Sequence, residues 1–359
     1  MTASPTLENV ESKLFTTADF KLQTGVVLPR VSLAYETYGT LASDGRNAVL
    51  MTHGYTGSHH FAGRYRAGGA PRGLGDGDVG SWDKLIGPGK AIDTDTLFVV
   101  ASNMLGSSYG STNPASLDPR TGKPYGPSFP HVVVADIVKA QALLLEHLGV
   151  EHLVAVAGPS YGGYQAFQWA VQYPDQMDGI VAAVTAPRAY GGAERTRALI
   201  ADLSSDPNWN DGWYYHRGGI PAAMTRVRVA TLKTNGVEAQ LRDRFPDPAE
   251  REAAIVRMAE PWARVYDPHS LIVLRRALEE FDTRPAFDRI RAKVLYVLSR
   301  TDALFPPSIG PEIMQALKAA GVDARYFEID TELGHMASGL AADKWSPVLA
   351  AFMRELAGA

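Results

Sequence analysis

The feature that most constrains the fold is a series of short, almost continuously apolar segments, many of them separated by helical patterns. These segments are residues 31–39, 48–54, 96–103, 152–158, 177–187, 292–300 and 324–330. A strand with one face in water alternates apolar and polar residues, whereas a strand covered on both faces is apolar throughout, as in a parallel sheet. The pattern therefore predicts a doubly wound α/β fold with a mostly parallel sheet.

One long segment interrupts this alternation. Residues 186–283 contain no convincing strand, but they contain charged stretches with helical propensity, such as ERTRALIADL and PHSLIVLRRALEEF. A helical insertion between two core strands is typical of a lid over the functional edge of a sheet. We expect a core made of residues 1–185 and 284–359 and a lid made of residues 186–283. The alternative is a separate helical domain.

The stretch LVAVAGPSYGGYQAFQWA, residues 153–170, changes from a strand pattern to a helix pattern at Gly158-Pro159-Ser160-Tyr161-Gly162. This fits the G-x-S-x-G nucleophile elbow, in which a tight strand-to-helix turn exposes a serine hydroxyl. Small residues are needed beside the serine because the backbone passes close to its neighbours in such a turn. The sequence on both sides therefore supports Ser160 as a catalytic nucleophile.

A serine nucleophile needs a base, and the base needs an acid that orients it. Chains with this elbow place them in the order Ser, Asp or Glu, His. Asp302 follows the apolar run 292–300, and His335 follows the run 324–330. Taken alone, Asp302 also suits a helix cap and His335 an ordinary loop position. Their order and their places at strand ends favour the triad Ser160, Asp302 and His335.

A tetrahedral intermediate requires hydrogen-bond donors for its oxyanion. The backbone N–H of Tyr161, directly after the serine, is expected to supply one, and that of Tyr55 in the loop HGYTG the second. His53 in the same loop is interpreted as structural support. His59 and His60 are interpreted as loop residues rather than metal ligands, because no further ligand completes a recognisable site.

Composition excludes several other classes of function. The chain has 35 basic and 39 acidic residues and a formal charge of −4, which gives no general attraction to nucleic acid or anionic membranes. It has no cysteine, so thiolate catalysis and disulfides are excluded. The polar start MTASPTLENVESKLF lacks the pattern of a secretory signal. We expect a cytoplasmic monomer or homodimer that acts on a small-molecule ester and uses no metal or redox cofactor.

Four stretches carry a resemblance to a known family: residues 82–130 (WDKLIGPGKA to GKPYGPSFP), 132–175 (VVVADIVKAQ to QWAVQYPD), 206–214 (DPNWNDGWY) and 299–307 (SRTDALFPP). The sequence resembles the homoserine O-acetyltransferase family of α/β-hydrolase-fold proteins over nearly its whole length. The resemblance implies a helical lid, a Ser-Asp-His triad at the positions given above, and acetyl transfer from acetyl-CoA through an acyl-serine.

The chain departs from this family where the acceptor is expected to bind. The resemblance implies an aspartate directly after the catalytic histidine for the homoserine ammonium, but Met336 follows His335. It also implies an arginine and a tyrosine of a lid helix for the substrate carboxylate. Arg226 matches the arginine, and Leu232 or Lys233 stands at the tyrosine position. A buried charge without a partner is costly, so the pocket for a zwitterion is weakened.

Two enzymatic functions are consistent with this sequence. The first, which the missing aspartate favours, is a serine-dependent carboxylic ester hydrolase that acts on short acyl esters, especially acetates. The second is an O-acetyltransferase that moves acetyl from acetyl-CoA to homoserine or a less polar alcohol, with Glu332 or Asp343 in place of the missing aspartate. A non-catalytic binding protein on the same scaffold is a third reading, which the intact triad disfavours.

Overall fold

The computed structural model describes residues 6–358; residues 1–5, which belong to the segment considered for a secretory signal, and Ala359 lie outside the described residues. An eight-stranded sheet has the order β1-β2-β6-β3-β7-β8-β9-β10, and β4 pairs with β5 beside it. The strands are β1 (Lys13–Lys21), β2 (Val27–Tyr38), β3 (Ala48–Thr52), β4 (Ile86–Gly87), β5 (Ile92–Asp93), β6 (Phe98–Ser102), β7 (Leu153–Pro159), β8 (Met177–Ala183), β9 (Lys293–Ser299) and β10 (Ala324–Ile329).

The sheet is parallel from β6 to β10, and only β1 and β2 run antiparallel to their neighbours. Every one of the apolar runs identified in the sequence overlaps one of these strands, although β2 begins four residues before its run and β7 ends one residue after its run. β1 is absent from these runs, because only Phe15 and Phe20 of the strand are buried along its hairpin with β2. The prediction of a mostly parallel sheet is confirmed.

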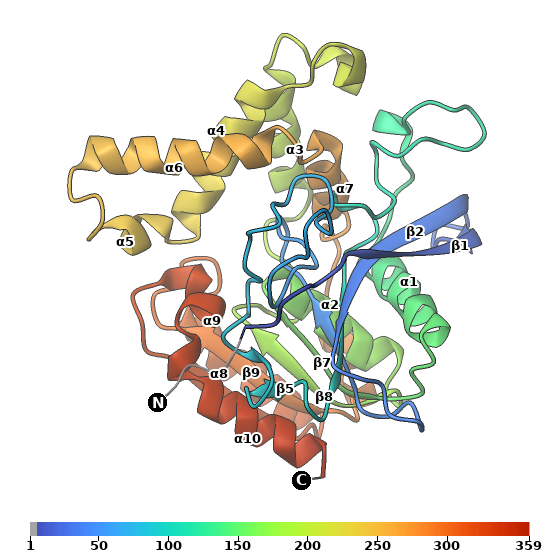
Figure 1. Cartoon of the computed structure of the whole chain (residues 1–359), viewed down its shortest axis with the longest axis vertical. Helices are drawn as coiled ribbons and strands as arrows, with labels where there is room; N and C mark the ends of the chain where they lie inside the picture. The colour runs from blue at the N-terminus through green and yellow to red at the C-terminus, as the bar shows by residue number, and fades with distance from the viewer. Residues whose placement is uncertain (1–5, 359) are drawn as a thin grey trace.

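Helices cover both faces of the sheet (Figure 1). Side chains of α1, α2 and α8 pack with Leu50 and Val156 on one face, whereas α10 packs with Met51 and Ala157 on the other. The fold is therefore the doubly wound α/β-hydrolase fold. The helices are α1 (Val134–His147), α2 (Tyr161–Gln172), α3 (Gly192–Ser204), α4 (Pro221–Thr234), α5 (Val237–Leu241), α6 (Pro248–Ala263), α7 (Pro268–Arg276), α8 (Gly310–Ala319), α9 (Ala337–Leu340) and α10 (Ser346–Leu356).

Helices α3 to α7 all fall between β8 and β9, within the segment 186–283 that the sequence marks as a lid. Figure 1 shows them gathered on one side of the molecule, with α4 and α6 lying against each other. The segment has cores of its own, which include Leu271, Trp262 and Tyr266 in one cluster and Leu232 and Ile255 in another. Within residues 6–358, no helix has both the length and the apolar character needed to cross a lipid bilayer.

Candidate active site

Ser160 lies at the turn between β7 and α2, where the sequence predicts the nucleophile elbow. Its backbone has φ 56° and ψ −118°, a conformation that L-residues rarely adopt. The backbone N–H of Ser160 donates to the carbonyl of Ala183 at 2.8 Å, and the hydroxyl of Thr185 donates to the carbonyl of Ser160 at 2.7 Å. Because strained residues persist only where their surroundings hold them, these contacts explain how the turn keeps its shape.

The glycines beside Ser160 are required by the close approach of β3. A Cβ atom at Gly162 would lie 1.9 Å from the carbonyl oxygen of Thr52, and one at Gly158 would lie 2.2 Å from the same atom. The Thr52 hydroxyl donates to the carbonyl of Gly162 at 2.9 Å. Thr52 on the neighbouring strand thus fixes the elbow. It can approach so closely because Gly158 and Gly162 have no side chains.

His335 and Asp302 lie together although 33 residues separate them. Nδ1 of His335 donates to Oδ2 of Asp302 at 2.8 Å, and both side chains are buried. This hydrogen bond places the proton on Nδ1 and leaves Nε2 as an acceptor. Oδ1 of Asp302 accepts from the backbone N–H of Leu304 at 2.8 Å, so the carboxylate also caps the following turn. Asp302 thus contacts both the candidate base and the backbone of its own loop.

The two loops that carry this pair are tied to each other. The hydroxyl of Thr301 donates to the carbonyl of Thr331 at 3.0 Å and accepts from the N–H of Gly334 at 3.1 Å. The ring of Phe305 stacks on the ring of His335, with centroids 5.6 Å apart. These contacts hold the imidazole against the carboxylate before any substrate binds.

The candidate oxyanion donors come from two segments that meet at Ser160. Tyr161 is the first residue of α2, where backbone N–H groups have no partner within the helix. The loop that carries Tyr55 is close, since a Cβ atom built on Gly54 would lie 3.7 Å from Cβ of Ser160. Tyr55 is held on both sides: its carbonyl accepts from the hydroxyl of Tyr266 at 2.9 Å, and its own hydroxyl donates to the carbonyl of Leu271 at 2.6 Å.

His53 orients the peptide group that carries the Tyr55 N–H. Nε2 of His53 accepts from the N–H of Met104 at 3.1 Å, so Nδ1 carries the proton and donates to the carbonyl of Gly54 at 2.8 Å. In a trans peptide the N–H of Tyr55 points opposite to that carbonyl. Burial lowers the pKa of His53 to about 4, which keeps the ring neutral. The structural role expected from the sequence thus includes fixing a candidate oxyanion donor.

His59 and His60 lie in the loop after β3, and both side chains are buried. Both are buried against the carboxylate of Glu36, which accepts from Nδ1 of His60 at 3.1 Å and from the hydroxyl of Tyr65 at 2.5 Å. Nε2 of His59 lies 2.8 Å from the hydroxyl of Ser12. Both histidines lie in the loop after β3, in line with their interpretation as loop residues, whereas their burial against Glu36 on β2 gave no sequence signal. Among the described residues there is no cluster of three or more histidines and acids suited to a metal ion.

Ser160 and His335 open into one cavity of about 980 Å³ between the sheet and the lid segment. Tyr55 and Tyr161 line its floor, and residues of α3, α4 and α7 line its other side. The arrangement combines an alcohol, a base oriented by a carboxylate, and backbone N–H groups beside the alcohol. These are the parts that acyl transfer through a serine requires.

The lid-helix arginine of this cavity is Arg228, not Arg226. Arg226 is exposed, does not line the cavity, and forms an ion pair with Asp202 at 3.3 Å and a hydrogen bond with Ser205 at 3.1 Å. Arg228 is partly buried and lines the cavity. The expectation for Arg226 is therefore corrected. Residues two apart on a helix point to different sides, and the sequence could not show which side of the helix faces the cavity.

Met336 lines the cavity, as expected from its place after His335, and Leu232 lines it too. Leu232 belongs to an apolar cluster of the lid segment, and Met336 packs against that cluster. Lys233 lies outside the cavity lining and pairs with Glu252 at 2.6 Å. Thus Met336 stands where the resemblance implies an aspartate, and of the two residues considered for the tyrosine position only the apolar Leu232 lines the cavity.

Neither of the two acids considered as replacements reaches the cavity. Glu332 is exposed and pairs with Arg300, with 2.5 Å between Oε1 and Nη2, while Asp343 is exposed. Neither is among the residues that line the cavity. The suggestion that one of them replaces the missing aspartate is therefore corrected.

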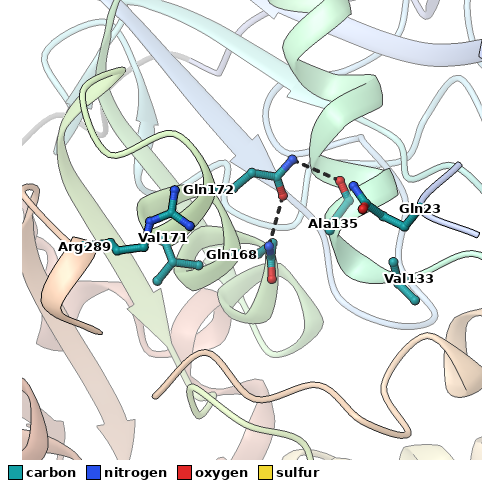
Figure 2. Close-up of a pocket in the computed structure, with 7 residues that line it drawn as sticks. All are labelled: Gln23, Val133, Ala135, Gln168, Val171, Gln172 and Arg289. Carbon is teal, nitrogen blue, oxygen red and sulfur yellow. Dashed lines mark hydrogen bonds between the residues drawn. The ribbon is translucent and has the colours of Figure 1, made fainter. Parts of the chain in front are cut away.

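A second hollow of about 460 Å³ lies between the start of α1, the end of α2 and Arg289 (Figure 2). Figure 2 shows Gln172 bonded to both Gln168 and the carbonyl of Ala135, with Arg289 beside Val171. None of the candidate catalytic residues lines this hollow. The candidate catalytic residues Ser160 and His335 line the larger cavity instead.

Comparisons with known proteins identify the family of the chain. A model of the alpha/beta hydrolase fold family matches residues 47–340. The homoserine O-acetyltransferase of Geotalea daltonii is 34% identical in an alignment that covers 96% of this chain and 98% of that protein. Among solved structures, esterase E22 has a TM-score of 0.87 at 27% identity, with 96% of this chain and 100% of that chain covered. The homoserine O-acetyltransferase from Bacillus anthracis has a TM-score of 0.85 at 26% identity, with 97% and 98% covered. The chain belongs to the homoserine O-acetyltransferase family of α/β-hydrolase-fold proteins.

Proposed function

We propose that the chain is an O-acyltransferase that takes acetyl from acetyl-CoA onto Ser160 and delivers it to an alcohol. The observation that carries this proposal is the likeness to homoserine O-acetyltransferases, which extends over 96% of the chain at 34% identity and so includes the lid segment. The comparisons thus favour the function that the sequence analysis placed second. Three arginines that line the cavity, Arg195, Arg228 and Arg275, are compatible with anionic reactants.

In the first half of the proposed reaction, Oγ of Ser160 attacks the thioester carbonyl while Nε2 of His335 takes its proton. Asp302 stabilises the imidazolium through the hydrogen bond to Nδ1. The N–H groups of Tyr161 and Tyr55 receive the oxyanion. When the intermediate collapses, the thiolate leaves with the proton from His335, and acetyl-Ser160 remains.

In the second half, the alcohol oxygen attacks the acetyl carbonyl and gives its proton to Nε2 of His335. Oγ of Ser160 then leaves and recovers that proton, so the products are the acetate ester and the free serine. The same two backbone donors support the second oxyanion. The partners in this proposal are small molecules only.

A specific observation favours carboxylic ester hydrolysis as a second candidate. Met336 and Leu232 make the wall near the base apolar, which weakens the binding of a zwitterionic acceptor and leaves water as a competitor. The structural match to esterase E22 also covers nearly the whole length of both chains. In this reading water takes the place of the alcohol in the second half.

A paired assay separates the two candidates. Purified protein is given acetyl-CoA with and without a panel of alcohols, and free thiol, ester product and acetate are all measured. Alcohol-dependent ester formation supports the transferase, whereas acetate as the sole acetyl product with every alcohol supports the hydrolase.

Mass spectrometry of the quenched protein tests the step that both candidates share: an acetyl adduct on Ser160 is expected. Ser160→Ala should reduce turnover by at least ~10³-fold. Near-normal activity in that variant would overturn both candidates.

A further inference from the structure

Three buried polar side chains of α1 and α2 form a chain of hydrogen bonds that ends at the loop after β3. Nε1 of Trp169 donates to Oε1 of Gln141 at 2.8 Å, and Nε2 of Gln141 donates to Oε1 of Gln165 at 2.7 Å. Nε2 of Gln165 then donates to the carbonyl of His53 at 3.1 Å. All three side chains are buried, so these groups depend on one another for their hydrogen bonds.

The direction of this chain is set by the indole at its start. Nε1 of Trp169 can only donate, so the oxygen of the Gln141 amide must face it. The NH₂ group of Gln141 then faces Gln165, whose own amide oxygen must accept. The NH₂ group of Gln165 is therefore left to donate, and it reaches the carbonyl of His53. Neither amide can turn over without losing a hydrogen bond.

Gln165 joins the two segments that carry the candidate oxyanion donors. It lies on α2 one helical turn after Tyr161, and its Nε2 is 3.3 Å from the carbonyl oxygen of Tyr161. His53, which it also contacts, opens the loop HGYTG that carries Tyr55. Within the described part of the chain, no other hydrogen bond joins this loop to α2. One side chain thus links the backbone of both donors.

The link acts on the peptide groups that precede the Tyr55 N–H. The carbonyl of His53 accepts from Gln165, and the carbonyl of Gly54 accepts from Nδ1 of the His53 ring. Nε2 of Gln165 also lies 3.1 Å from Sδ of Met104, whose N–H donates to the same ring. Both consecutive carbonyls are therefore held. Because each peptide group is planar, this fixes the direction of the Tyr55 N–H.

Packing alone does not require these amides. Val138 and Ala166, which belong to the same two helices, are part of the apolar core. Burial of an amide costs desolvation free energy that its hydrogen bonds only offset, and apolar side chains of the same shape can replace a buried polar pair with little loss of stability. A role in the geometry of the candidate site accounts for polar side chains at these positions.

We propose that Gln165 is a positioning residue, which holds the N–H of Tyr55 at a fixed distance from the N–H of Tyr161. Gln141 in turn keeps the Gln165 amide in its donating orientation. The inference rests on the proposed acyl-Ser160 chemistry, in which those two N–H groups receive the oxyanion. Donors that are held in place stabilise the transition state more than the bound ester, because the negative charge develops only there. No proton moves through Gln165.

Gln165→Met tests this proposal, because methionine fills a similar volume and cannot donate a hydrogen bond. Burst kinetics with p-nitrophenyl acetate give the burst amplitude, which counts the active molecules, the affinity for the ester, and the rate constant of acylation. We expect the rate constant to fall by about tenfold to hundredfold, less than the loss of a whole oxyanion donor. The burst amplitude and the affinity for the ester should stay unchanged.

The pH profile of acylation separates positioning of the oxyanion donors from damage to the base. Its midpoint should be the same in Gln165→Met and wild type, since His335 keeps Asp302 as its partner. A purely structural role would lower the burst amplitude and leave the rate constant of the remaining active molecules unchanged, and this result would overturn the inference. If the wild type forms no acetyl-Ser160 at all, the proposed function fails instead, so the two failures are distinguishable.

Gln168→Met is the matched control, because it removes another amide of α2 that contacts Gln172 at the second hollow. It should acylate like the wild type, and an equal fall in this variant would count against the assignment.

Gln141→Leu tests the rest of the chain of hydrogen bonds. It should lower the rate constant of acylation less than Gln165→Met does. The double variant should be no slower than Gln165→Met, because Gln141 acts through Gln165. Additive losses would contradict this order. Should Gln165→Met not fold, Gln141→Leu decides: a rate constant equal to that of the wild type contradicts the inference.

Discussion

Asp302 accepts two kinds of hydrogen bond at once: Oδ2 accepts from Nδ1 of His335 at 2.8 Å, and Oδ1 accepts from the backbone N–H of Leu304 at 2.8 Å. One oxygen thus fixes the tautomer of the candidate base, while the other fixes the loop that carries the carboxylate. The two functions of this side chain can be separated by a substitution that changes only one oxygen.

Asp302→Asn should make this separation. The amide oxygen can still accept from Leu304, but the NH₂ group facing His335 favours the tautomer with its proton on Nε2, which cannot accept the proton of Ser160. We expect turnover to fall by roughly 10⁴-fold with little loss of stability. Burst kinetics with p-nitrophenyl acetate measure the acylation step, and thermal unfolding provides the control. A fall of less than tenfold would show that His335 does not depend on Asp302.

Gly162→Ala should disrupt the elbow, because the new methyl group would lie 1.9 Å from the carbonyl oxygen of Thr52. Overpacking at a buried site costs about 1–3 kcal/mol, and here the clash is with backbone, which cannot rotate away. We expect a lower free energy of unfolding in urea together with loss of acylation. Gly77→Ala is the control, since a Cβ atom there meets nothing within 4 Å. An unchanged unfolding midpoint in Gly162→Ala would contradict the packing described for Thr52.

The neutral state of His53 predicts a loss of stability in acid. Its pKa is lowered from 6.5 to about 4 by burial, so between these values the unfolded chain binds a proton that the folded chain does not. The contribution of His53 is complete above pH 6.5 and falls by up to about 3 kcal/mol as the pH drops through 4.

Urea unfolding at pH 7 and pH 5 measures this effect. The difference between the two pH values should be smaller in His53→Gln than in the wild type. It should not be abolished, because burial also lowers the pKa of His59 to about 4. His131→Gln, at an exposed position, is the control. An identical pH dependence in His53→Gln and wild type would argue against the neutral, buried ring.

Met336→Asp should change the choice of alcohol. A carboxylate at this position gives a substrate ammonium the partner that the apolar wall denies it, so the use of L-homoserine relative to 4-hydroxybutanoate should rise by about tenfold. To measure this ratio, Ser160 is acetylated with p-nitrophenyl acetate and the two acetate esters formed from a mixture of both alcohols are quantified. Met258→Asp, on an exposed part of α6, controls for added negative charge. No change in the ratio would mean that Met336 does not face the alcohol.

The parallel part of the fold could be predicted because its strands are buried on both faces. β3 and β6, for example, are fully buried five-residue strands, and both appear in the sequence as unbroken apolar runs. β1 could not be found in this way. It carries lysines at both ends and buries only every few residues, because it pairs along one edge in a hairpin with β2.

The candidate triad was predictable because each member follows a recognisable strand, and the structure brings His335 and Asp302 into hydrogen-bond contact. Arg228 was not predictable, because the face of α4 that meets the cavity depends on how α4 packs against α6 and α3. The burial of His59 and His60 was hidden for a similar reason. Their partner Glu36 lies on another strand, and nothing in the sequence joins them.

The contact between Thr52 and the elbow links the geometry of Ser160 to the folding of the sheet. Thr52 belongs to β3, and its hydroxyl contacts Gly162, 110 residues further along the chain. The strained serine is therefore not a property of the local sequence, and an isolated peptide spanning β7 and α2 would not hold it. Contacts between segments so far apart form slowly during folding. The candidate nucleophile takes its shape only when β3 and β7 have joined at the centre of the sheet, so acylation of Ser160 should report completed folding rather than secondary structure.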